Sequence, residues 1–319
     1  MLKVVMLALC LLAVPLAQAQ GYPNRPVRIV VPFPPGAATD TLGRLIAQRL
    51  SESWNQPVTV ENRPGAGSII GAETGAKSAP DGSTIFMGHI GTHGANPALY
   101  AKLPYDPVRD VAPVSLLVSI PNLLAVHPSA PVHSVRELID LAKAKPGVLN
   151  VGSPGISTSA HLIIALFGSL TGAEMTHVPF KGTVAAMQSL VSGDVQVAFD
   201  TVTAIMPQAR AGKVRVLAIT SKERSPSAPD APPLAESGVP GFDVSTWFAF
   251  FVPAGTPPAT IEKINADVVR VMRAKEMSER LQGFGMNIIA SSPEQLAAHV
   301  TSEIARWGKV VREAGIKVE

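Results

Sequence analysis

Apolar runs of strand length alternate along this chain with segments of helical period. Residues 27 to 33 form the first apolar run, and the next segment places Leu42, Leu45, Ile46 and Leu50 on one helical face. The same alternation repeats from residue 83 to residue 219 and returns as a strand at 247 to 252. Because parallel strands need helical crossovers, the pattern predicts an α/β protein with mostly parallel sheets.

The expected helices carry their own start and stop signals. Ser134 and Glu137 have the Ser-x-x-Glu spacing of a capping box. Glycines stand just after three helical segments, at Gly172, Gly193 and Gly212, where a left-handed C-cap is expected. Two amphipathic helices are expected to finish the chain, the last with Ser292 as N-cap and Pro293 at its first position.

Two apolar stretches, 114 to 126 and 244 to 252, are expected to cross between two lobes and to form a hinge. The first lobe would then contain residues 20–121 and 247–319, and the second lobe residues 122–246. Each lobe would be a mostly parallel sheet flanked by helices, joined to the other by two crossover strands.

The first 19 residues have the pattern of a secretory signal peptide. Lys3 precedes an apolar run that is too short to span a membrane, and Ala17-Gln18-Ala19 forms a cleavage site. We therefore expect cleavage after Ala19 and export to the periplasm. Cys10, the one cysteine, lies in this leader, so the mature chain would have no cysteine chemistry. Acylation of Cys10 is disfavoured because Leu9 is not a small residue.

Composition excludes some partners. The formal net charge is +3, or +2 without Lys3, and the basic residues are spread along the chain, so no nucleic-acid surface is expected. The His89/His93 spacing resembles a zinc helix, but Gly91 and Gly94 argue against a helix there. We expect neither a metal site nor a cofactor.

The most informative segment follows the first strand. Ligands of open α/β sheets bind beyond the carboxyl ends of the strands, where helix N-termini offer free N–H groups to an anion. Gly36 and the alanines would let a carboxylate approach the backbone, and Thr39 adds a hydroxyl. The alternative is that Thr39 or Asp40 only caps the helix. The ligand-binding candidates in this segment are Phe33, Gly36, Ala37, Ala38, Thr39 and Asp40.

A second segment of the same kind runs from residue 152 to residue 161. Its candidates are Ser153, Gly155, Ser157, Thr158 and His161. If the lobes face each other, two helix N-termini from different lobes would hold one anion between them, with closure driven by the ligand. The alternative for His161 is a buried imidazole that ties the loop down.

Other strand ends add weaker candidates. Thr92 offers a hydroxyl in a third loop, and Asp200 ends a strand, where a turn or cap is as reasonable as a contact with a ligand amine. Lys181 would bring a charge to the cleft, although a solvated lysine is the default.

Motifs for catalysis are missing. The chain has no Gly-x-Ser-x-Gly elbow, no Gly-x-Gly-x-x-Gly at the first strand and no Walker sequence. A hydrolytic triad of Ser153, His161 and Asp200 is conceivable, but nothing in the sequence places the three in mutual reach.

These motifs together resemble the Bug solute receptors, also called the TctC-like receptors of tripartite tricarboxylate transporters. The resemblance spans nearly the whole mature chain and rests on six ordered segments: 32–40, 61–67, 96–100, 153–162, 177–182 and 240–242. It implies a two-lobed type II periplasmic binding protein fold and a carboxylate held by backbone amides and hydroxyls of the two loops. It also implies that Phe180 contacts the ligand.

The resemblance implies a non-enzymatic receptor, expected to be monomeric, that gives its ligand to membrane transporter subunits. A sensor of ligand for a signalling partner and a secreted serine hydrolase remain alternatives. The chain departs from the family pattern where Ala37 and Ser157 replace glycines, where Val151 replaces an aromatic residue, and where Phe180 replaces tyrosine. These changes bear on which carboxylate fits.

Overall fold

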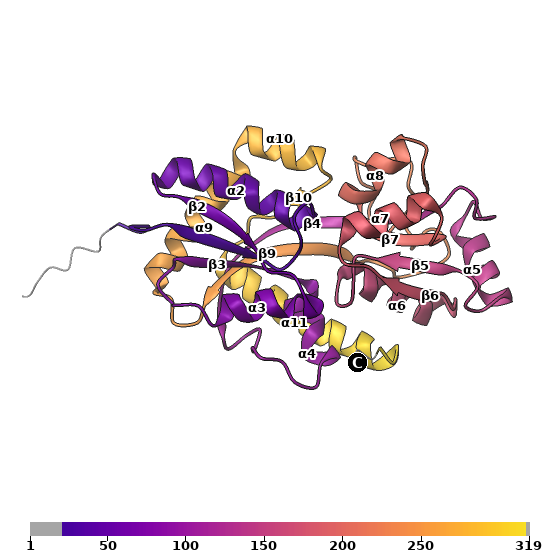
Figure 1. Ribbon diagram of the computed structural model, residues 1–319, viewed down its shortest axis with the longest axis horizontal. Helices are drawn as coiled ribbons and strands as arrows, with labels where there is room; N and C mark the ends of the chain where they lie inside the picture. The colour runs from indigo at the N-terminus through magenta and orange to yellow at the C-terminus, as the bar shows by residue number, and fades with distance from the viewer. Residues whose placement is uncertain (1–20, 317–319) are drawn as a thin grey trace, which may run out of the picture.

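The computed structural model describes residues 21–316, so the predicted signal peptide lies outside the described residues. The chain forms two α/β lobes side by side, joined by long strands (Figure 1). This confirms the predicted fold class. No helix in the described part is long and apolar enough to span a bilayer.

The first lobe combines both ends of the chain. Its N-terminal elements are β1 (Val27–Val31), α2 (Ala38–Trp54), β2 (Val58–Asn62), the turn η1 (Ala66–Ser68), α3 (Ile69–Ala76), β3 (Thr84–His89), the wide turn η2 (Gly91–Ala95) and α4 (Asn96–Leu99). The C-terminal elements are β9 (Ser245–Pro253), α9 (Pro258–Arg273), α10 (Lys275–Gly283), β10 (Asn287–Ile288) and α11 (Pro293–Glu313). Strand β1 pairs in parallel with β2 and β3, and β3 pairs antiparallel with β9.

The second lobe is built from the middle of the chain. Its elements are α5 (Val135–Ala144), β5 (Asn150–Ser153), α6 (Ser159–Thr171), β6 (Thr176–Pro179), α7 (Thr183–Ser192), β7 (Val197–Thr201), α8 (Val202–Arg210) and β8 (Arg215–Ile219). Strand β5 lies between β6 and β7 and is parallel to both. Gly172, Gly193 and Gly212 all have positive φ just past a helix, which is the backbone that the sequence predicted there.

Strand β4 (Val111–Val126) belongs to both sheets. Up to Pro121 it pairs with β9, and from Asn122 onward it pairs with β7 and β8. The two strands that meet at this change of partner are the two that the apolar pattern predicted to cross. The lobe boundaries themselves, at 121/122 and 246/247, stay a prediction.

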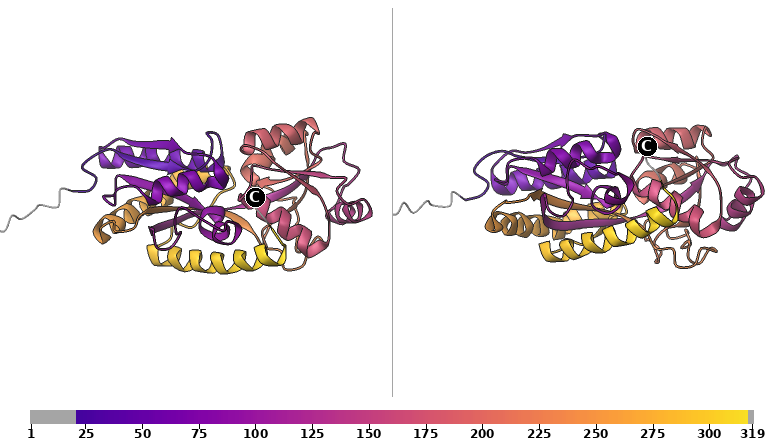
Figure 2. Two further views of the ribbon diagram at one scale, coloured as in Figure 1. Left: turned by 60° about the horizontal axis from the view of Figure 1, so that its bottom comes forward. Right: turned by 90° about the horizontal axis from the view of Figure 1, so that it is seen from below.

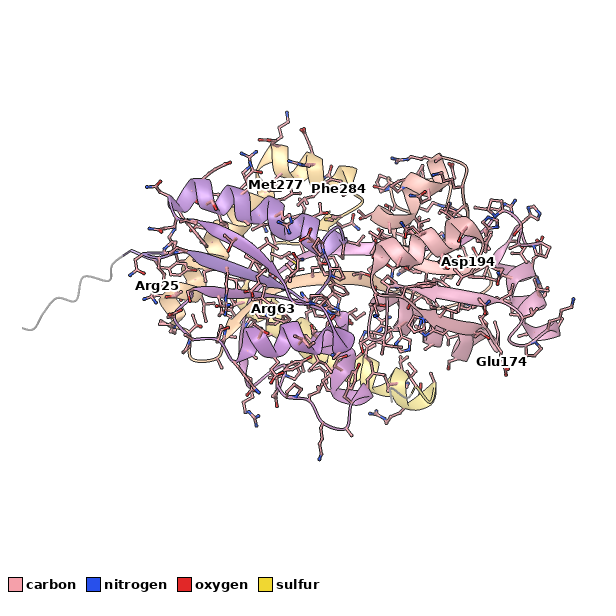
Figure 3. The ribbon with its side chains drawn as sticks, viewed as in Figure 1. Arg25, Arg63, Glu174, Asp194, Met277 and Phe284 are labelled. Atoms are coloured by element: carbon pink, nitrogen blue, oxygen red, sulfur yellow. The ribbon has the colours of Figure 1, made fainter. Side chains whose placement is uncertain are left out.

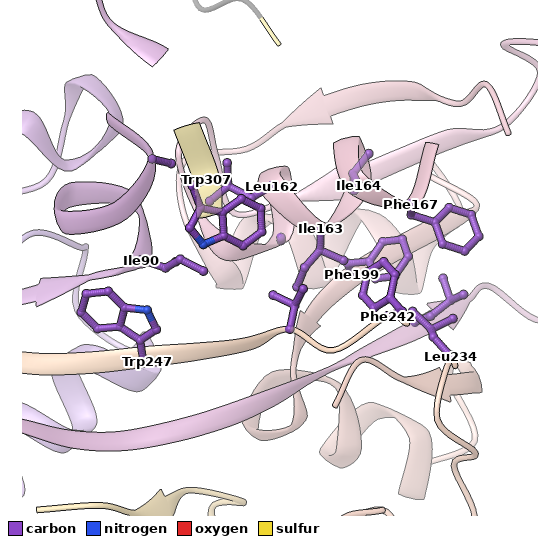
Figure 4. Close-up of a cluster of buried hydrophobic side chains, with 14 of the residues drawn as sticks. Ile90, Leu162, Ile163, Ile164, Phe167, Phe199, Leu234, Phe242, Trp247 and Trp307 are labelled. Carbon is purple, nitrogen blue, oxygen red and sulfur yellow. The ribbon is translucent and has the colours of Figure 1, made fainter. Parts of the chain in front are cut away.

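A hydrophobic cluster is continuous across the junction. Ile90, Trp247 and Trp307 of the first lobe pack in one cluster with Leu162 and Phe199 of the second (Figure 4). Helix α11 runs along the first lobe, and its end reaches the second (Figure 2). The indoles of Trp247 and Trp307 both donate to Glu303 Oε2, at 2.8 and 3.0 Å. The Trp247 bond fixes α11 to β9 near the crossing, and the Trp307 bond, within α11, holds the Glu303 carboxylate in place.

Three local predictions were wrong or incomplete. The C-terminal segment contains three helices rather than two, because the chain breaks at Ala274 between α9 and α10. Ser134 Oγ accepts from Glu137 N, but the Glu137 carboxylate accepts from His133 N, so only half of the capping box forms. Gly91 and Gly94 lie inside a helical turn, contrary to expectation.

The turn η2 forms because tertiary packing overrides the low helix propensity of glycine. A Cβ on Gly91 would lie 2.0 Å from the carbonyl oxygen of Ser157, in the other lobe. Glycine at this position therefore lets the two lobes touch backbone to backbone.

Candidate functional site

A cavity of about 530 Å³ lies between the lobes, beyond the carboxyl ends of the strands. Its lining comes from four segments: residues 32–34 after β1, 64–68 after β2, 154–156 with Thr158 after β5, and 179–182 at the end of β6. Arg63 marks the end of β2, next to the second of these segments (Figure 3). The two loops predicted to face each other therefore share one cavity.

A smaller pocket of about 40 Å³ continues from this cavity, and Phe33, Pro154 and Thr158 line both. We call it the deep pocket. Its other lining residues are Ala37, Ala38, Thr39, His89, Ser159, Thr183, Asp200, Thr201, Thr246 and Phe248. This volume holds one small polar group, since a water molecule takes about 30 Å³ of liquid.

Four helices begin at the deep pocket: α2 at Ala38, α6 at Ser159, α7 at Thr183 and α8 just after Thr201. Helices α2, α7 and α8 have no side-chain cap, so their first N–H groups are not used by a capping side chain. The positive ends of four helix dipoles thus surround one small space, which suits an anion. Sequence reasoning identified two of the four.

Two uncharged side chains at the deep pocket carry buried atoms without a partner among the described residues. These atoms are Thr39 Oγ1 and His89 Nε2. His89 Nδ1 accepts from Gly91 N at 3.0 Å, so the hydrogen of the neutral ring lies on Nε2. Burial lowers the pKa of His89 to about 3, which keeps the ring neutral. His89 and Thr39 therefore present N–H and O–H donors to whatever occupies the pocket.

Asp200 is the one acidic side chain that lines the deep pocket. Its Oδ1 accepts from Thr201 N at 2.7 Å and from Thr201 Oγ1 at 3.4 Å. Its Oδ2 is buried and has no partner in the described part of the chain. Burial raises the pKa of Asp200 to about 7, against the opposing effects of the Thr201 hydrogen bonds and of the nearby Thr183 hydroxyl.

The second loop is held from behind by two stacked imidazoles. His161 and His177 have ring centroids 4.9 Å apart. Ser153 Oγ lies 2.7 Å from His177 Nε2, and Ser157 N donates to His161 Nδ1 at 3.3 Å. Ser153, Ser157 and His161 line neither the cavity nor the deep pocket, whereas Gly155 and Thr158 line the cavity. For His161 the structure matches the alternative of a buried tie.

The first loop is held by a charged network instead. Asp40 accepts from Gly36 N at 3.1 Å, from Arg44 Nε at 3.0 Å and from Asn62 Nδ2 at 2.9 Å. Burial acts to raise the pKa of Asp40, but these hydrogen bonds, with the Arg44 charge, hold it below its usual value. Asp40 and Gly36 line neither pocket. The N-cap of α2 is Ala37, so neither Thr39 nor Asp40 is the capping residue.

Some of the remaining candidates line the cavity, and others support it from behind. Phe180 lines the cavity, as does Lys181, which is exposed. Thr92 is fully buried, and its hydroxyl bonds to the His89 backbone and to His93 Nδ1, so it supports the turn behind the pocket.

Sequence reasoning left out several lining residues. Residues 64–68 were missed because β2, which carries them to the cavity, was not predicted. Thr183 and Thr201 follow strand ends and open helices, so the rule used for the first two loops would have found them. His89, Thr246 and Phe248 reach the deep pocket from β3 and β9, and no local pattern indicates this.

The conceivable hydrolytic triad does not assemble. The imidazole at Ser153 belongs to His177, while His161 binds a backbone amide and Asp200 binds Thr201. Ser153 is also fully buried. The geometry of a Ser-His-acid relay is therefore not present in the described residues.

Comparison with known proteins agrees with this architecture. BugT of Bordetella pertussis is 36% identical over 302 residues, 94% of this chain and 93% of that protein. An R. palustris structure with adipate is 38% identical, with a TM-score of 0.89, over 93% of this chain and 99% of that one. MatC from Rhodopseudomonas palustris with bound malate is also 38% identical, with a TM-score of 0.86, over 91% and 100%.

The sequence model of the tripartite tricarboxylate transporter family receptor matches residues 42–316. This match covers both lobes and most of the residues around the cavity. The matched family is one of receptors, and neither it nor the two similar structures are named as enzymes. The chain therefore belongs to the receptor family of the tripartite tricarboxylate transporters.

Proposed function

We propose that this protein is a periplasmic receptor that captures a small carboxylate between its lobes and gives it to transporter subunits in the membrane. The deep pocket carries this proposal, because it gathers four helix N-termini with unpartnered donors on Thr39 and His89. These two donors have no other partner in the described chain, so an anion in that pocket would complete their hydrogen bonding. The adipate and malate of the two similar structures support the same ligand class.

The two connected spaces suggest how the ligand lies. The deep pocket has room for one carboxylate group, while the outer cavity is large enough for the rest of a small acid. The outer walls include five prolines together with Phe33, Ile156 and Phe180. These side chains favour an apolar body, and Lys181 at the edge offers a charge to a second acidic group.

The rest of the assignment follows from the family. Export through the signal peptide, cleavage after Ala19 and a monomeric receptor are parts of this proposal. Neither a cofactor nor nucleic acid has a role in it.

Thermal-shift and calorimetric titration with mono- and dicarboxylates, with neutral sugars of similar size as the reference set, tests the proposal. Binding of one acid should raise the melting temperature in a concentration-dependent way, while sugars should not. Binding of a sugar with no response to any acid would end this assignment.

A single hydroxyl gives the sharpest variant. Thr39→Val keeps the shape of the side chain and removes a buried donor that faces the deep pocket. We expect a loss of carboxylate affinity of about 1 to 3 kcal/mol, because the bound anion loses one hydrogen bond. Thr301→Val on the exposed face of α11 is the matched control and should bind normally. Equal affinity in both variants would remove Thr39 from the site.

A further inference from the structure

Asp200 conflicts with an anion-binding pocket unless a proton is present. Its Oδ2 is buried, unpartnered among the described residues and part of the deep pocket lining. The same pocket presents four helix N-termini, which favour a negative guest. Two carboxylates in contact inside a buried site cannot both be ionised, so one of them must hold a proton.

Among residues 21–316, no lysine or arginine lines the deep pocket to offset the charge of Asp200, and Lys181 lines only the outer cavity. Strand β7, which carries Asp200, packs against β4, β5, α6, α7 and α8. Strands β4 and β5 and helix α7 contain no titratable side chain, α6 brings only His161, and Arg210 lies in the last turn of α8, away from the pocket. Of the elements across the pocket, β3 brings neutral His89, β9 brings none, and Arg44 of α2 is paired with Asp40.

The hydrogen bonds of Asp200 decide which oxygen would hold the proton. Oδ1 accepts a hydrogen bond from Thr201 N, so a proton on Oδ1 would point at that amide hydrogen and is disfavoured. Oδ2 is free and can donate. A protonated Asp200 would then offer an O–H donor beside those of Thr39 and His89.

Building on the proposed function, we propose that Asp200 is protonated when the receptor is loaded and that its Oδ2–H donates to the ligand carboxylate. Where Asp200 is ionised in the free receptor, capture takes up one proton from solution, and no bond is made or broken in the ligand. The deep pocket accordingly selects a carboxylate head group over an ammonium group. An ammonium group would need ionised Asp200 and would face four positive helix ends.

The free receptor is poised for this exchange. Burial raises the pKa of Asp200 to about 7, so in the unloaded protein the Asp200 carboxyl group is partly ionised near neutral pH. Below pH 7 the proton is already in place and binding needs no uptake. Above pH 7 each further unit should weaken binding by up to about tenfold, because the proton must be taken from a more dilute pool.

Calorimetry with adipate and with malate, at pH 6 and pH 8 in buffers of different ionisation enthalpy, measures the proton directly. Both acids are largely ionised in this range, since their carboxyl groups titrate at roughly pH 4 to 5, and the small ligand fraction that is protonated at pH 6 is subtracted. We expect uptake close to one proton at pH 8 and little at pH 6. Zero uptake at pH 8 with a flat affinity profile, or release of a proton, would overturn the inference.

Asp200→Asn supplies an independent check. The amide keeps an acceptor for Thr201 N and places an N–H donor where Oδ2–H would be, so binding should survive and lose its pH dependence. Asp194→Asn on the surface of the same lobe is the control and should keep the uptake of the parent (Figure 3). A folded Asp200→Asn protein that still takes up a proton, or that no longer binds, contradicts the proposal.

Different results would exclude the carboxylate receptor and the proton on Asp200. Absence of binding by either acid at any pH, together with binding of a neutral solute, removes the carboxylate receptor and this proton with it. Normal carboxylate binding without proton uptake leaves the receptor intact and removes only the role of Asp200.

Discussion

The two ligand loops meet at one cavity but are held by different chemistry. The first loop is fixed by an ionised Asp40 that binds Gly36, Arg44 and Asn62 near the surface. The second is fixed by neutral, buried imidazoles that bind the peptide and hydroxyl groups of Ser153 and Ser157. Asp40 is itself buried, but its partner Arg44 is half exposed, so water screens this ion pair, whereas a buried neutral network is costly to break.

This difference predicts that damage to the second loop should be the more severe. In His161→Ala, the buried Ser157 N–H loses its acceptor and His177 loses its stacking partner. The combined loss of a buried hydrogen bond and of packing should lower the free energy of unfolding by about 2 to 4 kcal/mol. Urea unfolding followed by circular dichroism measures this value.

His133→Ala, at an exposed position in the same lobe, is the matched control and should change stability by less than about 0.5 kcal/mol. A loss in His161→Ala no larger than that of the control would show that the imidazole pair does not carry the loop.

Acid should separate the two loops without any mutation. Burial lowers the pKa of His161 and of His177 to about 4, from about 6.5 in the unfolded chain. The unfolded state therefore binds more protons between these values, and the stabilisation by both rings is lost as the pH falls from 6.5 to 4. Asp40 behaves differently, because its lowered pKa preserves its network until the pH falls below about 4.

Hydrogen exchange of backbone amides at pH 6.5 and at pH 4.5 resolves the loops separately. After correction for the intrinsic pH dependence, residues 153–161 should lose protection by roughly tenfold or more, and residues 33–40 should change little. A local probe is needed because the raised pKa of Asp200 has the opposite sign, stabilising the fold as the pH falls from 7 to 4. Equal loss in both loops would refute the comparison.

The smallest effect is expected at the charged support. Asp40→Ala removes the acceptor of Gly36 N and the partner of Arg44, which is half exposed. We expect a loss of about 1 to 2 kcal/mol in stability and a several-fold loss of carboxylate affinity through disorder of the loop. Asp140→Ala on helix α5 is a surface control. Unchanged affinity and stability in Asp40→Ala would mean that the loop holds its shape without this network.

Sequence reasoning recovered the features that depend on local pattern. The βα order, the glycine stops and the position of both loops follow from periodicity and from the backbone needs of glycine at Gly172 and Gly193. Which loop residues line the cavity and which support the loop does not follow from the sequence pattern, because it depends on which groups meet after folding. His177 reaches Ser153 from a neighbouring strand, and Asn62 reaches Asp40 from a strand that the pattern did not reveal.

Long-range contacts also explain the error at Gly91. Helix propensity argued against a helical turn there, but contact with Ser157 across the junction demands the absence of a side chain. The deep pocket itself depends on six separate segments of the chain, so no window of sequence contains it. The rule that ligands bind beyond strand ends, together with the family resemblance, identified its two main loops, and the folded arrangement added Thr183, Thr201 and His89.

Four helices begin at the deep pocket, so the donors available there include peptide N–H groups, which a change of side chain other than to proline cannot delete. In the proposed receptor, the groups that hold the carboxylate are therefore determined largely by the backbone fold. The outer walls, by contrast, are made of exchangeable side chains such as Ile156, Phe180 and Lys181. Such a receptor can change its preferred solute through substitutions in the outer walls, while the backbone donors that bind the carboxylate stay the same.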